Sequence, residues 1–276
     1  IAVLLYGIGA GFVTRPFVAA LSIVGALVLQ VSVNLWNDVE DHARLLDVPG
    51  TFGGAGNIQK GWLSQRRVKR VAVAALVLGL LCGVPALVLE PMPLSVIGVL
   101  ALLGTMGYSG KPFGLKYKAL GDITVLILCG PGLTLGFCWA AFGQIDQNVV
   151  ALGMFFGLAA VGILHVNNWQ DIDVDKRAGA TTVASAIGGT ASKIYLVLLY
   201  VGAIAAWIVV ALALKSWFLA VPALALVPTA MLVKDVLTAT DPSAPKLALV
   251  RIKAAQVHLL LGVTMCIGLG IALATH

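Results

Sequence analysis

The chain has 276 residues, of which 60% are hydrophobic and only 11% charged, and its formal net charge is +6. A soluble domain carries roughly a quarter charged residues, so this composition excludes an ordinary soluble globular protein. Apolar runs of about 20 residues recur without strand-like alternation, which excludes a β-barrel and predicts a polytopic bundle of membrane-spanning helices.

Charged stretches, or stretches rich in Pro and Gly, separate the predicted spans. In chain order the spans cover residues 17–40, 68–89, 92–109, 119–142, 148–170, 193–214, 216–237 and 252–274. An apolar run at residues 1–13 precedes them and is too short to cross a bilayer alone, so we interpret it as the tail of a truncated helix. The sequence therefore predicts an all-α fold of about nine helices around a central cavity that opens near the cytoplasmic side, in a single membrane-embedded domain covering residues 1–276.

The cationic residues indicate which side of the membrane each connection faces. When connections are assigned to alternate sides, 16 of the 18 Lys and Arg residues fall on one side, and only Arg15 and Lys215 fall on the other. The positive-inside rule makes the first side cytoplasmic, and it explains the net charge without a nucleic-acid partner. Ten of the 12 acidic residues share that side. Because the rule says little about acids, their accumulation suggests a common task at the cytoplasmic surface.

Two of the predicted spans end toward the cytoplasm in matching polar motifs. The first is NLWNDVED at residues 34–41, and the second is NNWQDIDVD at residues 167–175. Both follow the pattern Asn-x-Trp-x-Asp-x-acid, which indicates an internal duplication. Carboxylates at the negative end of a helix dipole are mutually unfavourable unless a cation joins them.

Helical spacing places the polar residues of each motif near one face of a helix. A carboxylate facing lipid at a helix centre would cost roughly 2.5–3.5 kcal/mol, so we expect these side chains to face a cavity inside the bundle. Two sets of oxygen ligands suit Mg²⁺, which is bound by one or two carboxylates, by water and by substrate phosphates. The expected metal ligands are Asp38, Asp41, Asp171 and Asp175. Solvated, capped helix ends are the alternative, and the matched duplication disfavours them.

Cationic side chains lie in the cytoplasmic loops near these motifs. The loop YSGKPFGLKYKALGD contains Lys111, Lys116 and Lys118, and Arg177 follows the second motif. Such side chains can pair with phosphate, although positive-inside topology by itself would also place lysines there. A Gly-rich stretch at residues 50–64 is either a lid whose backbone N–H groups approach phosphate or a flexible loop.

The two motifs resemble those of the UbiA-type intramembrane prenyltransferases, and the resemblance covers nearly the whole chain. The first motif matches the family's N-x-x-x-D pattern, with Asp41 as the next acid, but His42 stands where the family has a further acid. The second motif fits N-x-x-x-D-x-x-x-D in full. Within the superfamily the closest resemblance is to the 1,4-dihydroxy-2-naphthoate polyprenyltransferases of menaquinone biosynthesis, through NLWND, IQKGWLS, KYKALGD and NNWQDIDVDKRAG. The last signature usually continues with Lys-Arg-Thr, whereas this chain has Ala180-Thr181-Thr182.

The resemblance implies the transfer of a polyprenyl group from an allylic polyprenyl diphosphate to an aromatic acid. The implied acceptor is 1,4-dihydroxy-2-naphthoate, with loss of carbon dioxide to give demethylmenaquinone; 4-hydroxybenzoate and homogentisate are the alternatives. The four metal ligands are then catalytic, together with Asp122, which would assist a proton or hold the acceptor. The implied diphosphate contacts are Asn34, Asn167, Lys60, Lys111, Lys118 and Arg177. The implied contacts to the acceptor or the prenyl chain are Trp36, Asp47, Tyr108, Phe113, Tyr117 and Trp169.

An ion-coupled membrane transporter is the alternative from a different functional class, since it can also be polytopic, duplicated and rich in buried acids. Transporter sites usually lie near the bilayer midplane on broken helices. The acids of this chain cluster at one membrane surface instead, which favours the prenyltransferase interpretation.

Overall fold

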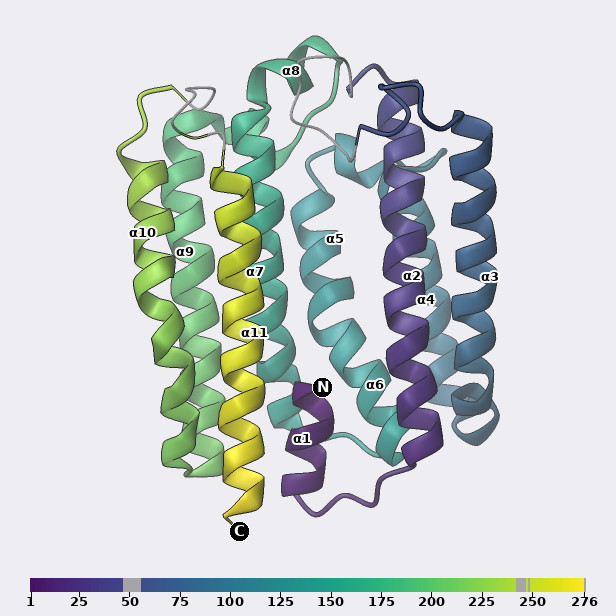
Figure 1. The fold of residues 1–276 in the computed structure, drawn as a ribbon, viewed down its shortest axis with the longest axis vertical. Helices are drawn as coiled ribbons and strands as arrows, with labels where there is room; N and C mark the ends of the chain where they lie inside the picture. The colour runs from purple at the N-terminus through teal and green to yellow at the C-terminus, as the bar shows by residue number, and fades with distance from the viewer. Residues whose placement is uncertain (47–55, 242–246, 248, 276) are drawn as a thin grey trace.

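The computed structural model describes residues 1–46, 56–241, 247 and 249–275, and within these ranges it is all-helical, with no β-strand (Figure 1). Among the described residues, eight helical segments are long and apolar enough to cross a membrane, and two of them combine more than one helix. The protein is therefore an integral, multi-pass membrane protein. The prediction of about nine helices is close, because residues 1–13 contain only the eight-residue helix α1 (Ala2–Gly9).

Most spans follow their predicted limits within a few residues. The unbroken ones are α2 (Pro16–Ala43), α3 (Gln65–Leu89), α4 (Pro91–Ser109), α7 (Gln147–Gln170) and α11 (Val250–Ala274). Two short helices lie in the connections, η1 (Leu115–Tyr117) and α8 (Ile172–Arg177). These helices agree with the prediction because a long apolar run, read by itself, is enough to indicate a span.

The predicted span 119–142 is broken in its middle. It consists of α5 (Gly121–Ile127), the π-helical segment η2 (Leu128–Gly132) and α6 (Leu133–Phe142). Pro131 lies inside η2 and removes a backbone donor, so the regular hydrogen-bond ladder is interrupted there. A Cβ atom at Gly130 would lie 2.8 Å from the carbonyl oxygen of Gly153, so glycine at this position lets the break pack closely against α7.

The two spans that follow also differ from the predicted limits. Helix α9 (Val183–Leu214) begins ten residues before the predicted start, with a capping box between Thr182 and Ser185 and a kink at Gly188. The predicted span 216–237 is a 3₁₀ segment, η3 (Trp217–Ala225), followed by α10 (Leu226–Leu237). The early start of α9 was missed because residues 183–192 are mostly small or polar and do not resemble a span by hydropathy.

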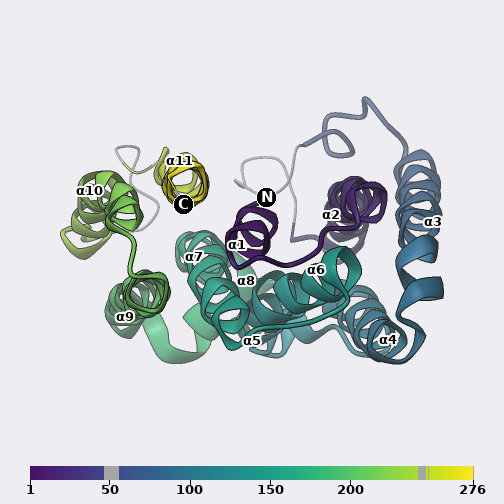
Figure 2. The same ribbon diagram turned by 90° about the horizontal axis from the view of Figure 1, so that it is seen from below.

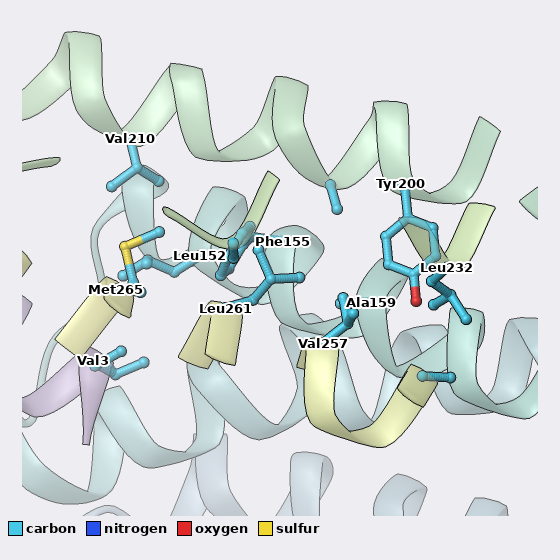
Figure 3. Packing of buried hydrophobic residues seen from close by; sticks show 14 of the residues in the cluster. Val3, Leu152, Phe155, Ala159, Tyr200, Val210, Leu232, Val257, Leu261 and Met265 are labelled. Carbon is cyan, nitrogen blue, oxygen red and sulfur yellow. The ribbon is translucent and has the colours of Figure 1, made fainter. Parts of the chain in front are cut away.

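The helices form an arc when the bundle is seen along its length. In Figure 2, α2, α3 and α4 lie to one side, α9, α10 and α11 lie to the other, and α5, α6 and α7 lie between them. Figure 3 shows the core where α7, α9 and α11 meet: Leu152 and Phe155 of α7 pack near Val210 of α9 and Leu261 of α11. Helix α7 is the most buried of the spans, which fixes the position of the motif at its end. The central cavity stays a prediction.

Candidate functional site

The first motif occupies the last turns of α2, at the upper end of the bundle in Figure 1. Asp41 is held there by two side chains of η1, those of Lys116 and Tyr117. The ammonium group of Lys116 lies 2.5 Å from Oδ2 of Asp41, and the hydroxyl group of Tyr117 donates a hydrogen bond of 2.7 Å to Oδ1. Arg44 lies 4.0 Å above the ring of Tyr117. The end of α2 is thus fixed to the loop that precedes α5.

The second motif crosses the junction of α7 and α8, at the same end of the bundle. Asp171 is the residue between the two helices, so the motif does not lie on one continuous helix. The spacing of the motif nevertheless persists, because the backbone N–H of Asp171 donates to Asn167 (3.1 Å) and that of Asp175 donates to Asp171 (2.8 Å). The polar residues of the motif therefore follow one another at helical intervals through the junction.

Backbone hydrogen bonds join the loop after α4 to the segment after α8. The N–H of Ala119 donates to the carbonyl of Thr181 (2.6 Å), and the N–H of Thr181 donates to that of Tyr117 (3.0 Å). The hydroxyl group of Thr182 donates to Oδ2 of Asp175 at 3.2 Å. The same segments that hold Asp41 therefore also hold Asp175, and they bring the two motifs together.

Asp175 is buried, and its carboxyl group responds to charges from both motifs. Burial, followed by the negative charges of Asp171 and Asp41, raises the pKa of Asp175, whereas the hydrogen bond from Thr182 and the charge of Lys116 lower it; together they place this pKa at about 6. Carboxylates of the two motifs thus lie within range of each other's charge. This mutual repulsion is the condition that a bound cation would relieve.

Arg251, in the first turn of α11, is the functional candidate that the sequence analysis missed. Its guanidinium group donates to Oδ1 of Asp171 (2.6 Å), to Oε1 of Gln170 (2.7 Å) and to the backbone carbonyl of Asn167 (3.3 Å). In the sequence this residue counted only toward the positive-inside topology. The signal available in the sequence was a cation directly before the span predicted at residues 252–274. Lys116 was noted in its loop but was not selected as a ligand.

Replacing Arg251 by Gln should lower the apparent midpoint of thermal unfolding by several degrees. The ion pair with Asp171 is largely shielded, with 14% and 22% of the two side chains exposed. We expect a loss of about 2 kcal/mol, between the ~0–1 kcal/mol of an exposed pair and the ~3–5 kcal/mol of a buried one. The measurement is a thermal unfolding scan of the purified protein in detergent.

The matched control for this prediction is Lys253→Gln, two residues further along α11. Lys253 pairs with Asp235 at 2.6 Å, but 47% of its side chain is exposed. Its replacement should change the midpoint by about a third as much or less. An equal decrease in both variants would show that the contacts of Arg251 at the second motif carry no special stability.

The donor atoms of the two motifs fit a hard divalent cation. Among the described residues, no group of three His, Cys, Asp or Glu side chains is arranged to hold a metal ion, and Asp41 and Asp171 are paired with cations. Oδ1 of Asn167 is buried and has no hydrogen-bond partner in the part of the chain that the structure describes. This all-oxygen set suits Mg²⁺ bound by few carboxylates together with oxygen atoms of a substrate phosphate.

Asp38 and part of the Gly-rich stretch border one small cavity. It is lined by Asp38, His42 and residues 56–59, and its volume is about 10 Å³. The described part of the stretch thus approaches the first motif, and whether it is a lid or a flexible loop stays open. Asp47 and residues 50–55 lie outside the described residues.

The other predicted diphosphate contacts lie at the surface. Asn34 is exposed and accepts a hydrogen bond from Gln30 (3.1 Å). Lys60 is exposed and lies 4.6 Å from the ring of Trp62. Arg177 is exposed, and its Nε donates to the backbone carbonyl of Asp173 (3.2 Å). Two further contacts are exposed in the loop after α4: Lys111 and Lys118. Their roles as ligands stay predictions.

The predicted aromatic residues differ in their surroundings. Tyr108 and Tyr117 are buried near the first motif, whereas Phe113 is 52% exposed. Trp169 is fully buried in the main core. Trp36 lies 5.2 Å below the ammonium group of Lys69. Of these aromatic residues, Tyr117 contacts a motif acid directly, through its hydrogen bond to Asp41, and Trp169 packs in the core. Their roles toward the acceptor or the prenyl chain stay predictions.

Asp122 is buried at the start of α5 and points toward a different neighbour from the motif acids. Its Oδ2 lies 3.3 Å from Nδ1 of His165 on α7, and no hydrogen bond or ion pair joins it to a motif acid among the residues that the structure describes. The predicted catalytic role of Asp122 is untested.

Comparison with known proteins places these motifs in a family context. The UbiA prenyltransferase family profile matches residues 1–254. A 1,4-dihydroxy-2-naphthoate octaprenyltransferase of Escherichia coli (strain K12) is 28% identical over 197 residues, which is 68% of this chain and 63% of that protein. The protein of the same name from Haemophilus influenzae (strain ATCC 51907 / DSM 11121 / KW20 / Rd) is 30% identical over 186 residues, 64% of this chain and 60% of that protein. UbiA prenyltransferase domain-containing protein 1 of Homo sapiens is 34% identical over 136 residues, 48% of this chain and 40% of that protein. The matched region therefore spans less than two thirds of the length of these relatives.

Proposed function

This chain belongs to the UbiA prenyltransferase family, and on that premise we propose that it transfers a polyprenyl group from an allylic polyprenyl diphosphate to 1,4-dihydroxy-2-naphthoate, with release of carbon dioxide. Family membership supports prenyl transfer as the activity and gives no support to the transporter alternative. The acceptor is proposed from the names of two relatives. It is also proposed from the resemblance of this chain's motifs to those of the 1,4-dihydroxy-2-naphthoate polyprenyltransferases.

A single observation carries the proposed mechanism: carboxylates of both motifs converge at one end of the bundle beside two cationic side chains. Asp41 is paired with Lys116 and Asp171 with Arg251, and Asp175 lies within range of both acids. A diphosphate with bound cations carries charges of both signs. An arrangement in which acidic and cationic side chains alternate is therefore suited to bind a diphosphate together with its cations.

The proposed metal ligands are Asp38 and Asp41 from the first motif and Asp171 and Asp175 from the second. When bound there, Mg²⁺ would supply electrostatic stabilisation of the negative charge on the departing diphosphate. Lys116 and Arg251 keep Asp41 and Asp171 in position through their ion pairs. Tyr117 fixes Asp41 through its hydroxyl group and presents a buried aromatic face beside it.

The reaction is an electrophilic aromatic substitution. The bond between the allylic carbon and the diphosphate breaks, and its electron pair leaves with the diphosphate. The ring carbon that carries the carboxyl group attacks the allylic carbon, after which carbon dioxide leaves and its electron pair restores the aromatic ring. The buried rings of Tyr108 and Tyr117 can stabilise the developing positive charge through their faces.

The proposed site faces the cytoplasm. The assignment rests on the 16-to-2 distribution of Lys and Arg residues between the two sets of connections that the sequence assigns to opposite sides of the membrane. We further propose that residues 1–276 act as one domain, in which the duplicated motifs at 34–41 and 167–175 supply the two halves of one site.

The test of this function is a competition between acceptors. Purified protein in lipid receives a polyprenyl diphosphate, Mg²⁺ and equal concentrations of 1,4-dihydroxy-2-naphthoate, 4-hydroxybenzoate and homogentisate, and mass spectrometry quantifies the products. We expect the decarboxylated naphthoate product to exceed the others at least about tenfold, which requires a discrimination of only ~1.4 kcal/mol. Preference for another acceptor would refute the naphthoate assignment and retain prenyl transfer. Absence of diphosphate release with all three would refute the activity.

A further inference from the structure

Arg44 is a cation beside the first motif that has no acidic partner among the described residues. It is the first residue after α2, and the carbon of its guanidinium group lies 4.0 Å from the centre of the Tyr117 ring. Neither Glu40 nor Asp41, on the preceding turn, forms an ion pair with it. Its side chain makes no hydrogen bond to a described residue, and Nε is buried without a partner there.

The other cations that contact the two motifs are already paired. Lys116 is paired with Asp41, and Arg251 is paired with Asp171. One oxygen of Asp41 accepts from Lys116 and the other accepts from Tyr117, so both have a donor without Arg44. Arg44 is therefore a positive charge that lies next to the first motif but does not hold its acid in position.

The guanidinium group of Arg44 is held by its neighbours, while its outer nitrogen atoms stay accessible. Stacking on an aromatic face fixes a guanidinium group and leaves the N–H groups at its edge free to bind. The residue is partly exposed, and within the described chain Nε is its one nitrogen that is both buried and unpaired. A Cβ atom at Gly114 would lie 3.2 Å from Cδ2 of Tyr117 and 3.5 Å from Nη2 of Arg44, so the start of η1 packs closely beside the stacked pair.

The proposed reaction needs a positive charge at such a place. The acceptor keeps its carboxylate until the new carbon–carbon bond has formed, and the carbon that bears the carboxylate is the one that attacks. The carboxylate must therefore lie close to the departing diphosphate, beside acids that would repel it. A carboxylate that loses its hydration without gaining a counter-charge is strongly disfavoured. A guanidinium group offers two parallel N–H groups that match the two oxygens of a carboxylate.

We propose that Arg44 binds the carboxylate of the aromatic acid acceptor and thereby selects acceptors that carry one. Tyr117 joins the two parts of the site, because its hydroxyl group donates to Asp41 and its ring supports Arg44. Loss of carbon dioxide then removes the group that Arg44 holds, which favours release of the neutral product. This inference rests on the proposed function, since it names the residue that recognises the acceptor of that reaction.

The test measures binding of an acceptor analogue without turnover. The protein in lipid nanodiscs receives Mg²⁺ and an unreactive thio analogue of geranyl diphosphate, and is titrated with fluorescent 1-hydroxy-2-naphthoate or with the matched 1-hydroxy-2-naphthamide. We expect the naphthoate to bind at least about tenfold more tightly than the amide, as for a hydrogen bond between charged groups. Arg44→Gln should abolish this preference and still bind the amide, which shows that the variant is folded. Equal binding of both ligands to the unmodified protein, or an unchanged preference in Arg44→Gln, would overturn the proposal.

A second arm distinguishes the carboxylate from the diphosphate as the anion that Arg44 binds. The thio analogue, titrated with Mg²⁺ alone, should bind Arg44→Gln and the unmodified protein with affinities within about twofold of each other. Weaker binding of the analogue together with an intact preference for the naphthoate would assign Arg44 to the diphosphate and overturn the proposal.

The matched control variant is Arg66→Gln, which removes an exposed arginine in the first turn of α3. It should keep the preference for the naphthoate; loss of the preference in this variant as well would show that general positive charge selects the acid, and would overturn the role of Arg44. Naphthoate binding that depends on Arg44, without any prenyl transfer, would refute the proposed function and retain the carboxylate site. Prenyl transfer with an unchanged naphthoate KM in Arg44→Gln would retain the function and overturn this inference.

Discussion

Replacing Asp171 by Asn should leave the bundle folded and lower turnover at least about a hundredfold. The side chain keeps its size and one oxygen but loses the charge that pairs with Arg251 and that is proposed to hold Mg²⁺. Removing one preorganised contact to developing charge typically costs about 10²–10³ in rate. The measurement is the initial rate of diphosphate release, with elution volume and unfolding midpoint as checks on the fold.

The duplication extends this prediction to Asp38, the equivalent residue of the first motif, for which Asp38→Asn should have a comparable effect. Asp235→Asn is the matched control, since Asp235 lies at the same end of the bundle and pairs with Lys253 outside both motifs. The control should stay within about twofold of the unmodified rate, as befits an exposed ion pair. Near-normal turnover in either motif variant would refute the metal assignment.

The spans could be predicted because hydropathy is a local property of the sequence. The run predicted at 68–89 is observed as Gln65–Leu89, and the run predicted at 148–170 as Gln147–Gln170. The sequence analysis did not predict the break inside the span at residues 119–142. The break at Gly130 and Pro131 depends on the close approach of α7 through Gly153, which no reading of residues 119–142 alone can show.

The acids of the candidate site could be predicted, but their partners could not. Duplication and spacing single out Asp38 and Asp171 without any structure, because the pattern repeats within the chain. Arg251 is 80 residues from Asp171 in sequence, and Lys116 is 75 from Asp41. Such pairs are products of tertiary packing, and positive-inside topology gives every loop cation the same apparent explanation.

The pairing of Asp122 with His165 could not be predicted from the sequence, for a related reason. A single His in an apolar run carries no pattern, and the catalytic role that the family resemblance implies for Asp122 does not indicate His165 as its neighbour. The packing of α5 against α7, with Gly130 beside Gly153 and Gly157, sets these two residues side by side. Among the described residues, no hydrogen bond or ion pair joins this pair to the motif acids.

Removing divalent cations with EDTA should abolish prenyl transfer, and Mg²⁺ should restore it without any redox metal. The physical reason is the proximity of the motif carboxylates: burial and the charge of Asp171 raise the pKa of Asp175, and Oδ1 of Asn167 has no hydrogen-bond partner among the described residues. Without a divalent cation, a diphosphate placed there would add negative charge to a site already rich in it. Sustained turnover in metal-free buffer would contradict this prediction.

A second readout separates metal binding from catalysis. Mg²⁺ with a non-reactive diphosphate should raise the unfolding midpoint of the unmodified protein, because a ligand at about 100 times its Kd stabilises the folded state by ~2.7 kcal/mol. Asp175→Asn should lose most of this gain, since it removes a proposed ligand, while the exposed Asp173→Asn should keep it. An equal gain in both variants would place the cation elsewhere. Equal loss would instead show that the charge of the second motif as a whole, and not the buried position of Asp175, determines the affinity.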